Sequence, residues 1–153
     1  MLVILVGTIA SGKSTWAKQK AYDGFLVLND DSIVTMLHGG NYDLYNKELK
    51  PVYKSIENAI VSSVLSAGKD IIIDRGVNIT RRSRKRWIGI ASAFDVESHV
   101  IVFPFKELEV HVERRMKDPR GLSYEEWMEA VRRHIKEYEV PFVEEGFKTV
   151  KWI

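Results

Sequence analysis

The sequence predicts an α/β fold in which a parallel β-sheet carries helices on both faces. Short runs rich in Val, Ile, Leu and Phe recur along the chain, helical segments separate them, and a glycine-rich loop follows the first run. The first four runs are continuously apolar rather than alternating, which is typical of strands that are covered on both faces. Strands that alternate with helices favour parallel pairing, because each helix carries the chain back across the sheet.

Five strands are expected along the chain. They cover Leu2–Val6, Phe25–Leu28, Asp70–Asp74, His99–Phe103 and Lys148–Ile153. No linker, repeat or low-complexity segment divides the 153 residues, so residues 1–153 are predicted to form a single domain. Open parallel sheets bind ligands at the carboxyl ends of their strands, and we therefore expect the functional residues directly after each strand.

Composition restricts the class of protein. The chain is 45% hydrophobic and 29% charged, with a net charge of only +2, which does not by itself indicate a nucleic-acid-binding protein. It has no cysteine, which excludes disulfides, thiolate metal sites and thiol catalysis and fits a reducing compartment. The first apolar run is too short for a signal peptide or a membrane span. We predict a cytoplasmic protein with no membrane partner and no obligate protein partner.

The helix in the middle of the chain has clear boundary signals. Pro51 stands at a first-turn position and Gly68 follows the last periodic residue. Between them, apolar residues recur at helical spacing, at Val52, Ile56, Ala59, Ile60 and Val64. We expect this stripe to face the sheet.

Two further helices are predicted near the C-terminus. The first carries a narrow apolar stripe at Leu108, Val112 and Met116. The second begins at a capping box, Ser123 to Glu126, and ends before Pro141. Its inward positions are expected to be Trp127, Val131, Ile135 and Tyr138.

The loop after the first strand, Gly7–Ser14, reads Gly-Thr-Ile-Ala-Ser-Gly-Lys-Ser and matches the phosphate-binding P-loop pattern. Backbone N–H groups must approach a polyanionic triphosphate closely, and glycine removes the side chains that would prevent it. The loop then opens a helix whose free N–H groups and dipole favour negative charge. The alternative is a glycine-rich turn without a ligand. We predict nucleotide binding through Gly7, Ala10, Ser11, Gly12, Lys13, Ser14 and Thr15, with Lys13 on the outer phosphates and Ser14 on a magnesium ion.

Acidic residues follow the second and third strands. One interpretation of Asp30 and Asp31 is that they cap the next helix. The other is that Asp30 is the base of a kinase and accepts the proton of an attacking hydroxyl. Asp74 ends an Ile-rich strand and is placed like the acid that organises magnesium in P-loop enzymes, although Asp is also common in turns and caps.

Two arginine-rich segments come next. The run Arg81–Arg86 opens a helix whose dipole it opposes, and it is either a phosphate-contacting surface or a solvated basic face. Arg114 and Arg115, near a helix C-terminus, are explained by the dipole alone. Arg120 lies between Pro119 and Gly121 on an expected exposed turn, from which a mobile lid could carry it to the transferring phosphoryl group.

Together these motifs resemble the polynucleotide 5′-hydroxyl kinase branch of P-loop kinases, including viral members, and the related zeta-toxin-like kinases. The resemblance rests on Gly7–Ser14, the Asn29–Asp31 turn, Asp74 with Asn78, the arginines that follow, and Arg120. It implies a three-layer P-loop sandwich with a five-stranded parallel sheet and an arginine-bearing lid. It also implies transfer of the γ-phosphate of ATP to a hydroxyl, with Mg²⁺ as cofactor.

Carried over by position, the resemblance implies roles for individual residues. Lys13 and Ser14 would serve phosphate and magnesium, Asp30 would be the base, Asp74 a supporting acid, and Arg120 the lid arginine that contacts ATP. Kinases of this branch carry an arginine three residues after the base, on the substrate's 3′-phosphate, and that position is Ile33 here. Either Arg75 or Arg82 replaces it, with Asn78 as a further substrate contact, or the acceptor is not an ordinary nucleic-acid 5′ end.

The predicted function is therefore an ATP-dependent phosphotransferase whose acceptor is a hydroxyl of DNA or RNA, in the first place a polynucleotide 5′-OH. A phage-type kinase of 5-hydroxymethyluracil in DNA is one alternative. A small-molecule or nucleoside kinase is another, with the acceptor under the segment Tyr42–Tyr45. A nucleotide-dependent switch or ATPase without an acceptor is a third.

Overall fold

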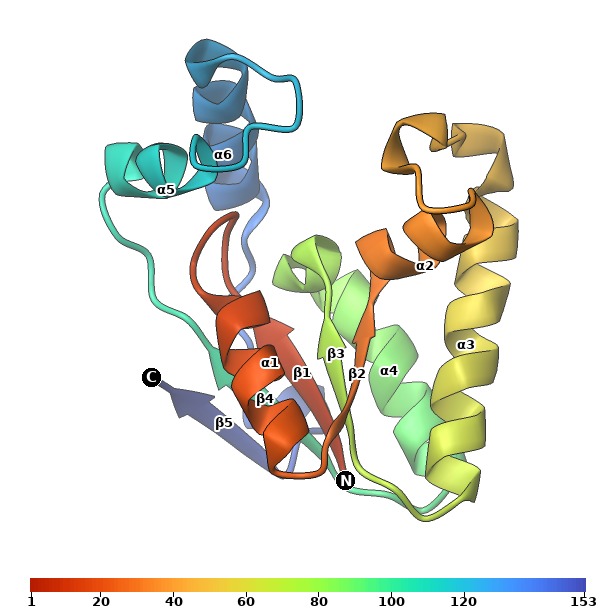
Figure 1. Ribbon diagram of the computed structural model, residues 1–153. Helices are drawn as coiled ribbons and strands as arrows, with labels where there is room; N and C mark the ends of the chain where they lie inside the picture. Colours follow the sequence, from red (N-terminus) through yellow and green to blue (C-terminus); the bar gives the residue numbers. More distant parts are fainter.

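The computed structural model describes residues 1–153 and contains one five-stranded parallel sheet. Its strands are β1 (Leu2–Val6), β2 (Leu26–Asn29), β3 (Ile71–Asp74), β4 (Ser98–Val102) and β5 (Thr149–Trp152). They lie in the order β2-β3-β1-β4-β5, and helices cover both faces of the sheet (Figure 1). The predicted α/β P-loop fold is confirmed, and each predicted strand is present within two residues of its expected ends.

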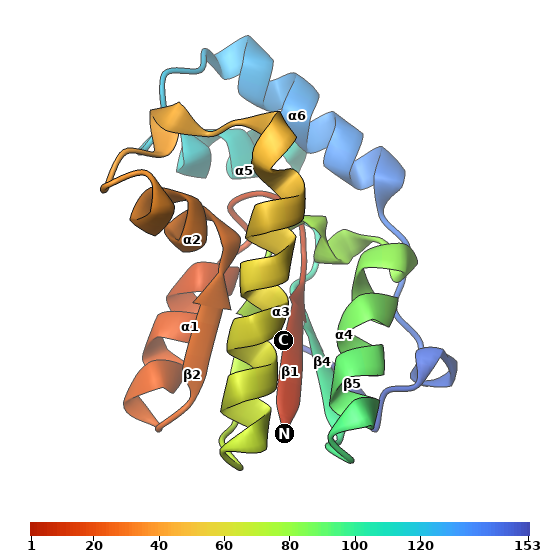
Figure 2. The same ribbon diagram turned by 90° about the vertical axis from the view of Figure 1, so that its right-hand side faces the viewer.

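The helices and the short 3₁₀ turns fill the connections between the strands. The helices are α1 (Lys13–Tyr22), α2 (Asp30–Leu37), α3 (Lys50–Ser66), α4 (Arg81–Ala93), α5 (Leu108–Arg115) and α6 (Tyr124–Glu137). The 3₁₀ turns cover Tyr42–Leu44, Lys47–Leu49, Gly76–Ile79 and Val143–Glu145. In Figure 2, α6 crosses above the carboxyl ends of the strands, at the same end of the sheet as the loop after β1. None of the helices has the length and apolar character that a membrane span needs.

The strand order explains why the functional loops meet. β1 pairs with β3 on one side and with β4 on the other, while β2 pairs with β3 at the edge. The chain therefore leaves β1 in one direction to form β2 and β3 and then crosses to the opposite side for β4. At this change of direction the loops after β1, β2 and β3 open onto one crevice, as expected for an open parallel sheet.

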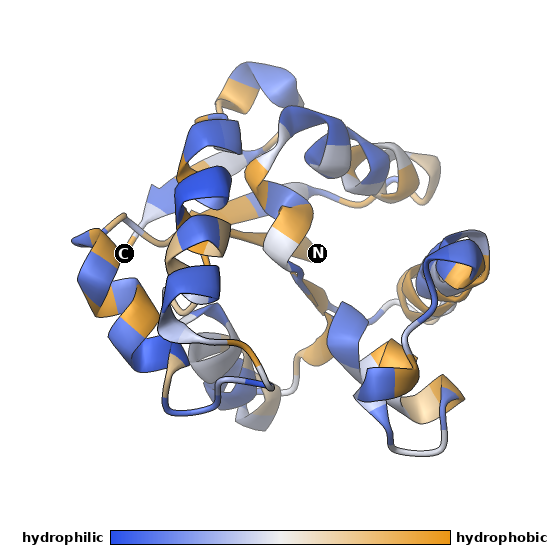
Figure 3. Ribbon diagram, turned by 90° about the horizontal axis from the view of Figure 1, so that it is seen from above, coloured by the Kyte–Doolittle hydropathy of each residue, from blue (hydrophilic) through white to orange (hydrophobic).

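Two apolar layers hold the sheet between its helices. Alternate residues of β1 point to opposite faces, so Ile4 joins a cluster with Val61 and Trp87 from α3 and α4. Leu5 belongs to the other cluster, with Ala17 of α1. Every residue of β1 is buried, which accounts for its continuous hydrophobicity. Seen from above, the strands are mostly hydrophobic and the helices carry both hydrophobic and hydrophilic residues (Figure 3).

Three details of the predicted burial are wrong. β2 was expected to be covered on both faces, but it is an edge strand and Leu26 is 46% exposed. On α3 the buried stripe is Tyr53, Glu57, Val61 and Leu65, whereas Val52 lies on the outer face and Ile56, Ile60 and Val64 lie at the margin of the core. On α6 the capping box is confirmed, but Ile135 is exposed because only one side of this helix meets the rest of the molecule.

Candidate active site

The glycines of the P-loop are required by its geometry. A Cβ atom on Gly7 would lie 2.7 Å from Ser11 Oγ and 2.8 Å from Phe103 Cβ, so no larger residue fits without movement. Gly12 has a φ of 103°, in the left-handed region that favours glycine. No side chain caps the N-terminus of α1, so its first N–H groups are free to bind an anion.

Lys13 is folded back onto the loop. Its Nζ donates hydrogen bonds to the carbonyl oxygens of Gly7, at 2.9 Å, and Thr8, at 2.7 Å. Burial lowers the pKa of Lys13 to about 8, while the charges of Asp74 and Asp30 raise it. A polyphosphate in the loop would add negative charge beside this ammonium group and stabilise its charged form.

Six of the predicted nucleotide-binding residues line one cavity of about 370 Å³, and Gly7 and Arg120 do not. Its lining consists of Ala10, Ser11, Gly12, Lys13, Ser14, Thr15 and Arg114. Gly7 is buried beneath the loop rather than at its surface. Arg114, from α5, was missed by the sequence analysis because an arginine near a helix C-terminus already has an explanation. Only the position of α5 over the loop brings its guanidinium to this cavity.

Asn29, and not Asp30 or Asp31, caps helix α2. Its Oδ1 accepts a hydrogen bond from the Ser32 N–H at 3.0 Å, so the capping interpretation of the two acids is wrong. The Nδ2 of Asn29 donates to Asp74 Oδ2 at 3.1 Å, across the paired ends of β2 and β3. This bond fixes the carboxylate of Asp74 at the edge of the crevice and leaves Asp30 and Asp31 free for other contacts.

Asp30 and Asp74 both act electrostatically on Lys13, which places the two carboxylates beside the P-loop. Asp74 is 3% exposed and has no cationic partner in an ion pair. Burial raises the pKa of Asp30 to about 6, and Arg75, which donates to it at 3.2 Å, lowers it.

A magnesium ion is compatible with this arrangement. The structure contains no cluster of three or more histidine, cysteine or carboxylate side chains able to hold a metal ion. A divalent cation would therefore need the phosphates of a nucleotide as ligands in addition to protein groups. The hydroxyl of Ser14 and the unpaired carboxylate of Asp74 are the oxygen ligands that Mg²⁺ prefers.

Glu57 organises a charged chain that runs from the candidate base into the space between α3 and α4. Its carboxylate is 2% exposed and lies 3.3 Å from the Nε of Arg75 and 2.7 Å from an Nη of Arg86. Arg86 also lies over the ring of Trp87, at 4.1 Å from its centroid. The sequence analysis did not single out Glu57, although its spacing of four from Tyr53 and Val61 places it on the buried face.

A second cavity, of about 500 Å³, opens beside Asp30 and is called here the acceptor cavity. Five cationic residues, three carboxylates and three tyrosines are among the residues that line it. These are Lys50, Lys54, Arg75, Arg82, Arg86, Asp30, Asp31, Glu57, Tyr42, Tyr45 and Tyr53. The predicted substrate residues Asp30, Arg75 and Arg82 are thus brought together.

Asn78 does not belong to the acceptor cavity, and the substrate contact predicted for it does not fit its position. It has no exposed surface, and its Nδ2 donates to the carbonyl oxygens of Leu5, at 3.2 Å, and Ile73, at 3.1 Å. Its Oδ1 accepts a hydrogen bond from the indole N–H of Trp87 at 3.2 Å. Asn78 therefore ties β1, β3 and α4 together.

The basic run Arg81–Arg86 of α4 was predicted to be either a phosphate-contacting surface or a solvated basic face, and as a whole it is neither. Arg84 is fully buried and bonds both carboxylate oxygens of Glu145, at 2.8 Å and 2.7 Å. Arg86 pairs with Glu57, whereas Arg82 lines the acceptor cavity and Lys85 is exposed. The run thus divides into structural, cavity-facing and solvated members.

Arg120 does not contact the P-loop in this structure. It lies between α5 and α6 with a φ of 49°, and its Nη1 donates to Asp31 Oδ2 at 2.6 Å. Its guanidinium carbon is 5.5 Å from the centre of the Tyr42 ring. The segment that carries Arg120 is therefore attached to the wall of the acceptor cavity, and Arg120 is not among the residues that line the P-loop cavity.

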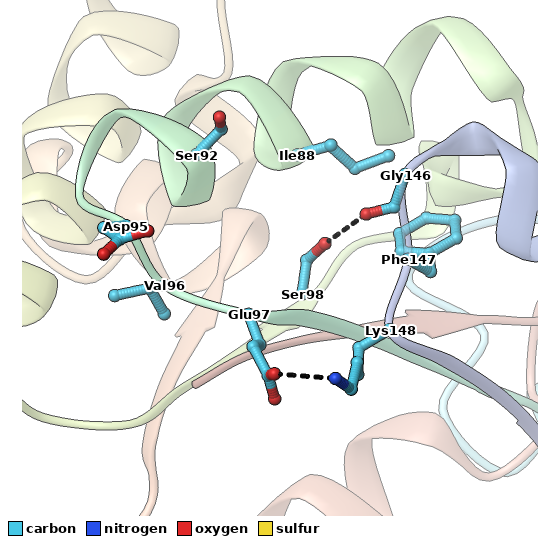
Figure 4. Close-up of a pocket in the computed structure, with 9 residues that line it drawn as sticks. All are labelled: Ile88, Ser92, Asp95, Val96, Glu97, Ser98, Gly146, Phe147 and Lys148. Atoms are coloured by element: carbon cyan, nitrogen blue, oxygen red, sulfur yellow. Dashed lines mark hydrogen bonds and ion pairs between the residues drawn. The ribbon is translucent and has the colours of Figure 1, made fainter.

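A further cavity, of about 560 Å³, lies by the amino end of β4 and is lined by residues from α4, β4 and the segment before β5 (Figure 4). Glu97 pairs with Lys148 at 3.2 Å, and Ser98 Oγ donates to the Gly146 carbonyl at 3.3 Å. Four of its lining residues are thus bonded in two pairs, and none of the predicted site residues lines it.

Three features define the class of protein: the P-loop between β1 and α1, the strand order, and the acids at the ends of neighbouring strands. Together they show that the protein has a P-loop kinase fold. It belongs to the AAA domain family, whose model matches residues 2–142. A search of curated proteins gives no match.

Solved structures with the same fold include kinases of different substrates. One is a chain of the Pnkp1/Rnl/Hen1 RNA repair complex, at 22% identity and a TM-score of 0.68, covering 90% of this chain and 46% of that chain. Another is shikimate kinase from Acinetobacter baumannii in complex with shikimate, at 18% identity and a TM-score of 0.59. The match covers 97% of this chain and 81% of that chain. A third is Kti12 from Chaetomium thermophilum in complex with ADP-AlF3, at 14% identity and a TM-score of 0.61, covering 100% and 88%. At these identities the similarity shows the fold alone.

Proposed function

We propose that the protein is an ATP- and magnesium-dependent kinase that phosphorylates a hydroxyl of a nucleic acid, in the first place a polynucleotide 5′-OH. The observation that carries the proposal is the position of Asp30. Its carboxylate lines the acceptor cavity and acts electrostatically on Lys13, which lines the P-loop cavity. A nucleotide in one cavity and an alcohol in the other would therefore meet at Asp30.

On the nucleotide side, the chain's own groups neutralise phosphate charge. Backbone N–H groups at the start of α1 bind phosphate oxygens, and Lys13 exchanges the carbonyls of Gly7 and Thr8 for the outer phosphates. Ser14 and Asp74 would hold a magnesium ion there, which supplies further neutralisation when it is bound. Arg114, on the rim of the same cavity, adds a second cation.

On the acceptor side, Asp30 orients the hydroxyl. With a pKa of about 6 it is ionised at neutral pH and accepts a hydrogen bond from the alcohol. The alcohol oxygen then forms a bond to the γ-phosphorus as the bond to the β-phosphate oxygen breaks, and the proton passes to Asp30 while ADP leaves. The loose transition state requires positioning and charge stabilisation more than early proton removal.

A small-molecule kinase is the second candidate function. The acceptor cavity, at about 500 Å³, is within the usual size range for sites that enclose a free metabolite. Shikimate kinase also has this fold. In this case the three tyrosines and the unpaired cations of the cavity would contact a single small acceptor.

The test is a transfer assay with γ-labelled ATP and Mg²⁺ against a panel of acceptors. The panel contains 5′-hydroxyl DNA and RNA, DNA with 5-hydroxymethyluracil, free nucleosides and sugar acids. We expect label on a polynucleotide 5′ end. Label only on a sugar acid or a free nucleoside would establish the second candidate, and phosphate release that no acceptor increases would indicate an ATPase.

Two variants test the assigned residues. Lys13→Ala and Asp30→Asn should each reduce transfer by at least about a hundredfold, because one removes a phosphate contact and the other the base. Lys18→Ala and Asp23→Asn, at exposed positions outside both cavities, are the matched controls and should retain activity. Full activity of either test variant would remove that residue from the mechanism.

A further inference from the structure

Helix α6 carries a histidine on its inner face. Figures 1 and 2 show α6 at the end of the sheet where the loop after β1 lies. His134 comes three residues after the buried Val131 and four before Tyr138, a helical spacing that puts these side chains on one face of α6. The neighbouring Ile135 is 38% exposed. The polar His134, and not the apolar Ile135, is therefore on the side of α6 that meets the rest of the molecule.

The ring of His134 lies close to residues of both cavities. A Cβ atom built on Gly76 would be 3.5 Å from the Cε1 atom of His134, so the ring packs on the turn after β3. Gly76 directly follows Arg75, which lines the acceptor cavity. The imidazole also feels the charge of Lys13, which lines the P-loop cavity. His134 itself lines neither cavity, and its neighbours place it at the junction between them.

A hydrogen-bonding group of this ring has no use within the protein. The Nδ1 atom of His134 is buried and has no hydrogen-bond partner. Buried polar atoms of native proteins are nearly always bonded, so an unpartnered one beside a candidate active site indicates a ligand. A packing role would explain the position of the ring, but an apolar side chain would fill the same space without leaving a polar nitrogen unpaired.

The surroundings of the imidazole favour an anion. Burial in the first place, and then the charges of Lys13 and Arg133, lower the pKa of His134 to about 4. The side chain is therefore uncharged at neutral pH, and it still donates one hydrogen bond through the ring nitrogen that carries its proton. Both charges that act on it are positive. A phosphoryl oxygen could accept the hydrogen bond of the ring while these cations neutralise its charge.

We propose that His134 is a further catalytic residue, whose imidazole donates a hydrogen bond to the γ-phosphoryl group of the bound nucleotide. This inference rests on the nucleotide-binding part of the proposed function. During transfer the γ-phosphoryl group passes from the P-loop cavity toward Asp30, and His134 lies at the junction that it must cross. A donor at this position stabilises the negative charge on the phosphoryl oxygens in the transition state.

The contact is tested first by nucleotide binding, which needs no acceptor. Calorimetric titration in the presence of Mg²⁺ compares ADP with the non-hydrolysable ATP analogue AMP-PNP. His134→Leu keeps an apolar side chain in place and removes the donor. It should weaken AMP-PNP binding by about tenfold and leave ADP binding unchanged, because only the analogue carries a γ-phosphoryl group. Arg132→Leu, at an exposed position on the opposite face of α6, is the matched control and should change neither affinity.

The kinetic test uses the acceptor that the wild-type protein phosphorylates. His134→Leu should lower kcat by about tenfold to a hundredfold, because a hydrogen bond to a charged group is lost in the transition state. The KM for the acceptor should change little, since His134 does not line the acceptor cavity. His134→Gln retains a neutral N–H donor and should recover part of the loss. A residue needed only for packing would show the reverse order, with His134→Leu more active than His134→Gln.

Nuclear magnetic resonance gives a readout that does not depend on activity. The chain has four histidines, and the Cε1–H signal of His134 is assigned by its absence from the His134→Gln spectrum. AMP-PNP should move this signal further than ADP does. His99, near the amino end of β4, forms a hydrogen bond with Thr149 Oγ1 at 2.9 Å and is the internal reference, whose signal should stay in place.

The outcomes separate failure of this inference from failure of the proposed function. If His134→Leu weakens ADP and AMP-PNP equally, or weakens neither, the contact with the γ-phosphoryl group is wrong. Equal movement of the His134 signal by both nucleotides has the same meaning. If His134→Leu weakens AMP-PNP alone but the protein phosphorylates no nucleic acid, this inference stands and the proposed acceptor fails. If the wild-type protein binds neither nucleotide, both fail together.

Discussion

The ionisation of Asp30 depends on two opposing effects of its surroundings. Burial disfavours the charged carboxylate and raises its pKa to about 6, and the neighbouring charge of Arg75 limits that rise. A general base is active only when it is ionised. Activity should therefore be lost as the pH falls through the pKa of Asp30 and should reach a plateau above it.

Arg75→Met provides a test of this balance. Removing the cation takes away the interaction that lowers the pKa of Asp30, so the acid limb of the kcat/KM profile should move to higher pH. The measurement is a pH–rate profile from about pH 5 to about pH 8, with Lys85→Met as the control. A limb that stays in place or moves to lower pH would show that Asp30 is not the titrating base. Glu57 remains paired with Arg86 in the variant, so Asp30 is the carboxylate whose surroundings change most.

At the residue scale, the sequence predicts positions that a local motif defines and misses positions that depend on packing. The pattern of the P-loop placed Lys13 and its neighbours, and the ends of two strands placed Asp30 and Asp74. Glu57 and Arg114 come from helices whose orientation the motif does not specify. Asn78 was misassigned because an amide after a strand looks the same in sequence whether it faces a substrate or bonds two backbone carbonyls and an indole in the interior.

Among the elements, the P-loop is the most sensitive to substitution at a single position. Gly7→Ala would place a methyl group within 2.8 Å of both Ser11 Oγ and Phe103 Cβ, so the loop must shift. We expect at least about a tenfold loss of ATP affinity, measured by calorimetric titration, because the phosphate-binding N–H groups move with the loop. Gly89→Ala on α4 is the control, since its Cβ meets no atom within 4 Å. Equal ATP affinity in both variants would contradict a close-fitting loop.

Helix α4 is anchored to the segment before β5 by the buried pair Arg84–Glu145. Arg84→Met leaves the carboxylate of Glu145 without its main partner and should lower the free energy of unfolding by about 3–5 kcal/mol. Urea denaturation measures the loss. Lys85→Met, at the next and exposed position, should change stability by less than about 0.5 kcal/mol. Adding Glu145→Gln should recover part of the loss, and strict additivity of the two changes would argue against a coupled pair.

At the element scale, the existence of helices and strands could be predicted better than their environment. Continuous apolar runs identified the first four strands, whereas the run that became β5 also contains lysine and threonine. The exposure of β2 could not be predicted, because an edge position depends on strand order. The stripe of α3 was misplaced by one position because its true inward face includes the charged Glu57 and the polar hydroxyl of Tyr53.

For the molecule as a whole, the sequence alone did not determine how the two cavities are connected. The resemblance implied a five-stranded parallel sheet but no strand order was predicted, and the residues of the acceptor cavity come from segments far apart in the chain. The connection is the contact of Arg120 with Asp31, which joins the segment between α5 and α6 to helix α2 across the crevice. We expect a bound nucleotide to compete with Asp31 for the guanidinium of Arg120.

Asp31→Asn should shift this competition toward the nucleotide. Both side chains of the ion pair are 39% exposed, so it is worth at most about 1 kcal/mol, and its loss should tighten ATP binding by up to about fivefold. Asp118→Asn is the matched control, because Asp118 also contacts Arg120, at 3.6 Å, but belongs to the same moving segment. The gain should disappear in an Arg120→Ala background, since no guanidinium is then released. A gain that persists there, or an unchanged ATP affinity of Asp31→Asn, would mean that Arg120 does not move from the acceptor wall to the phosphates.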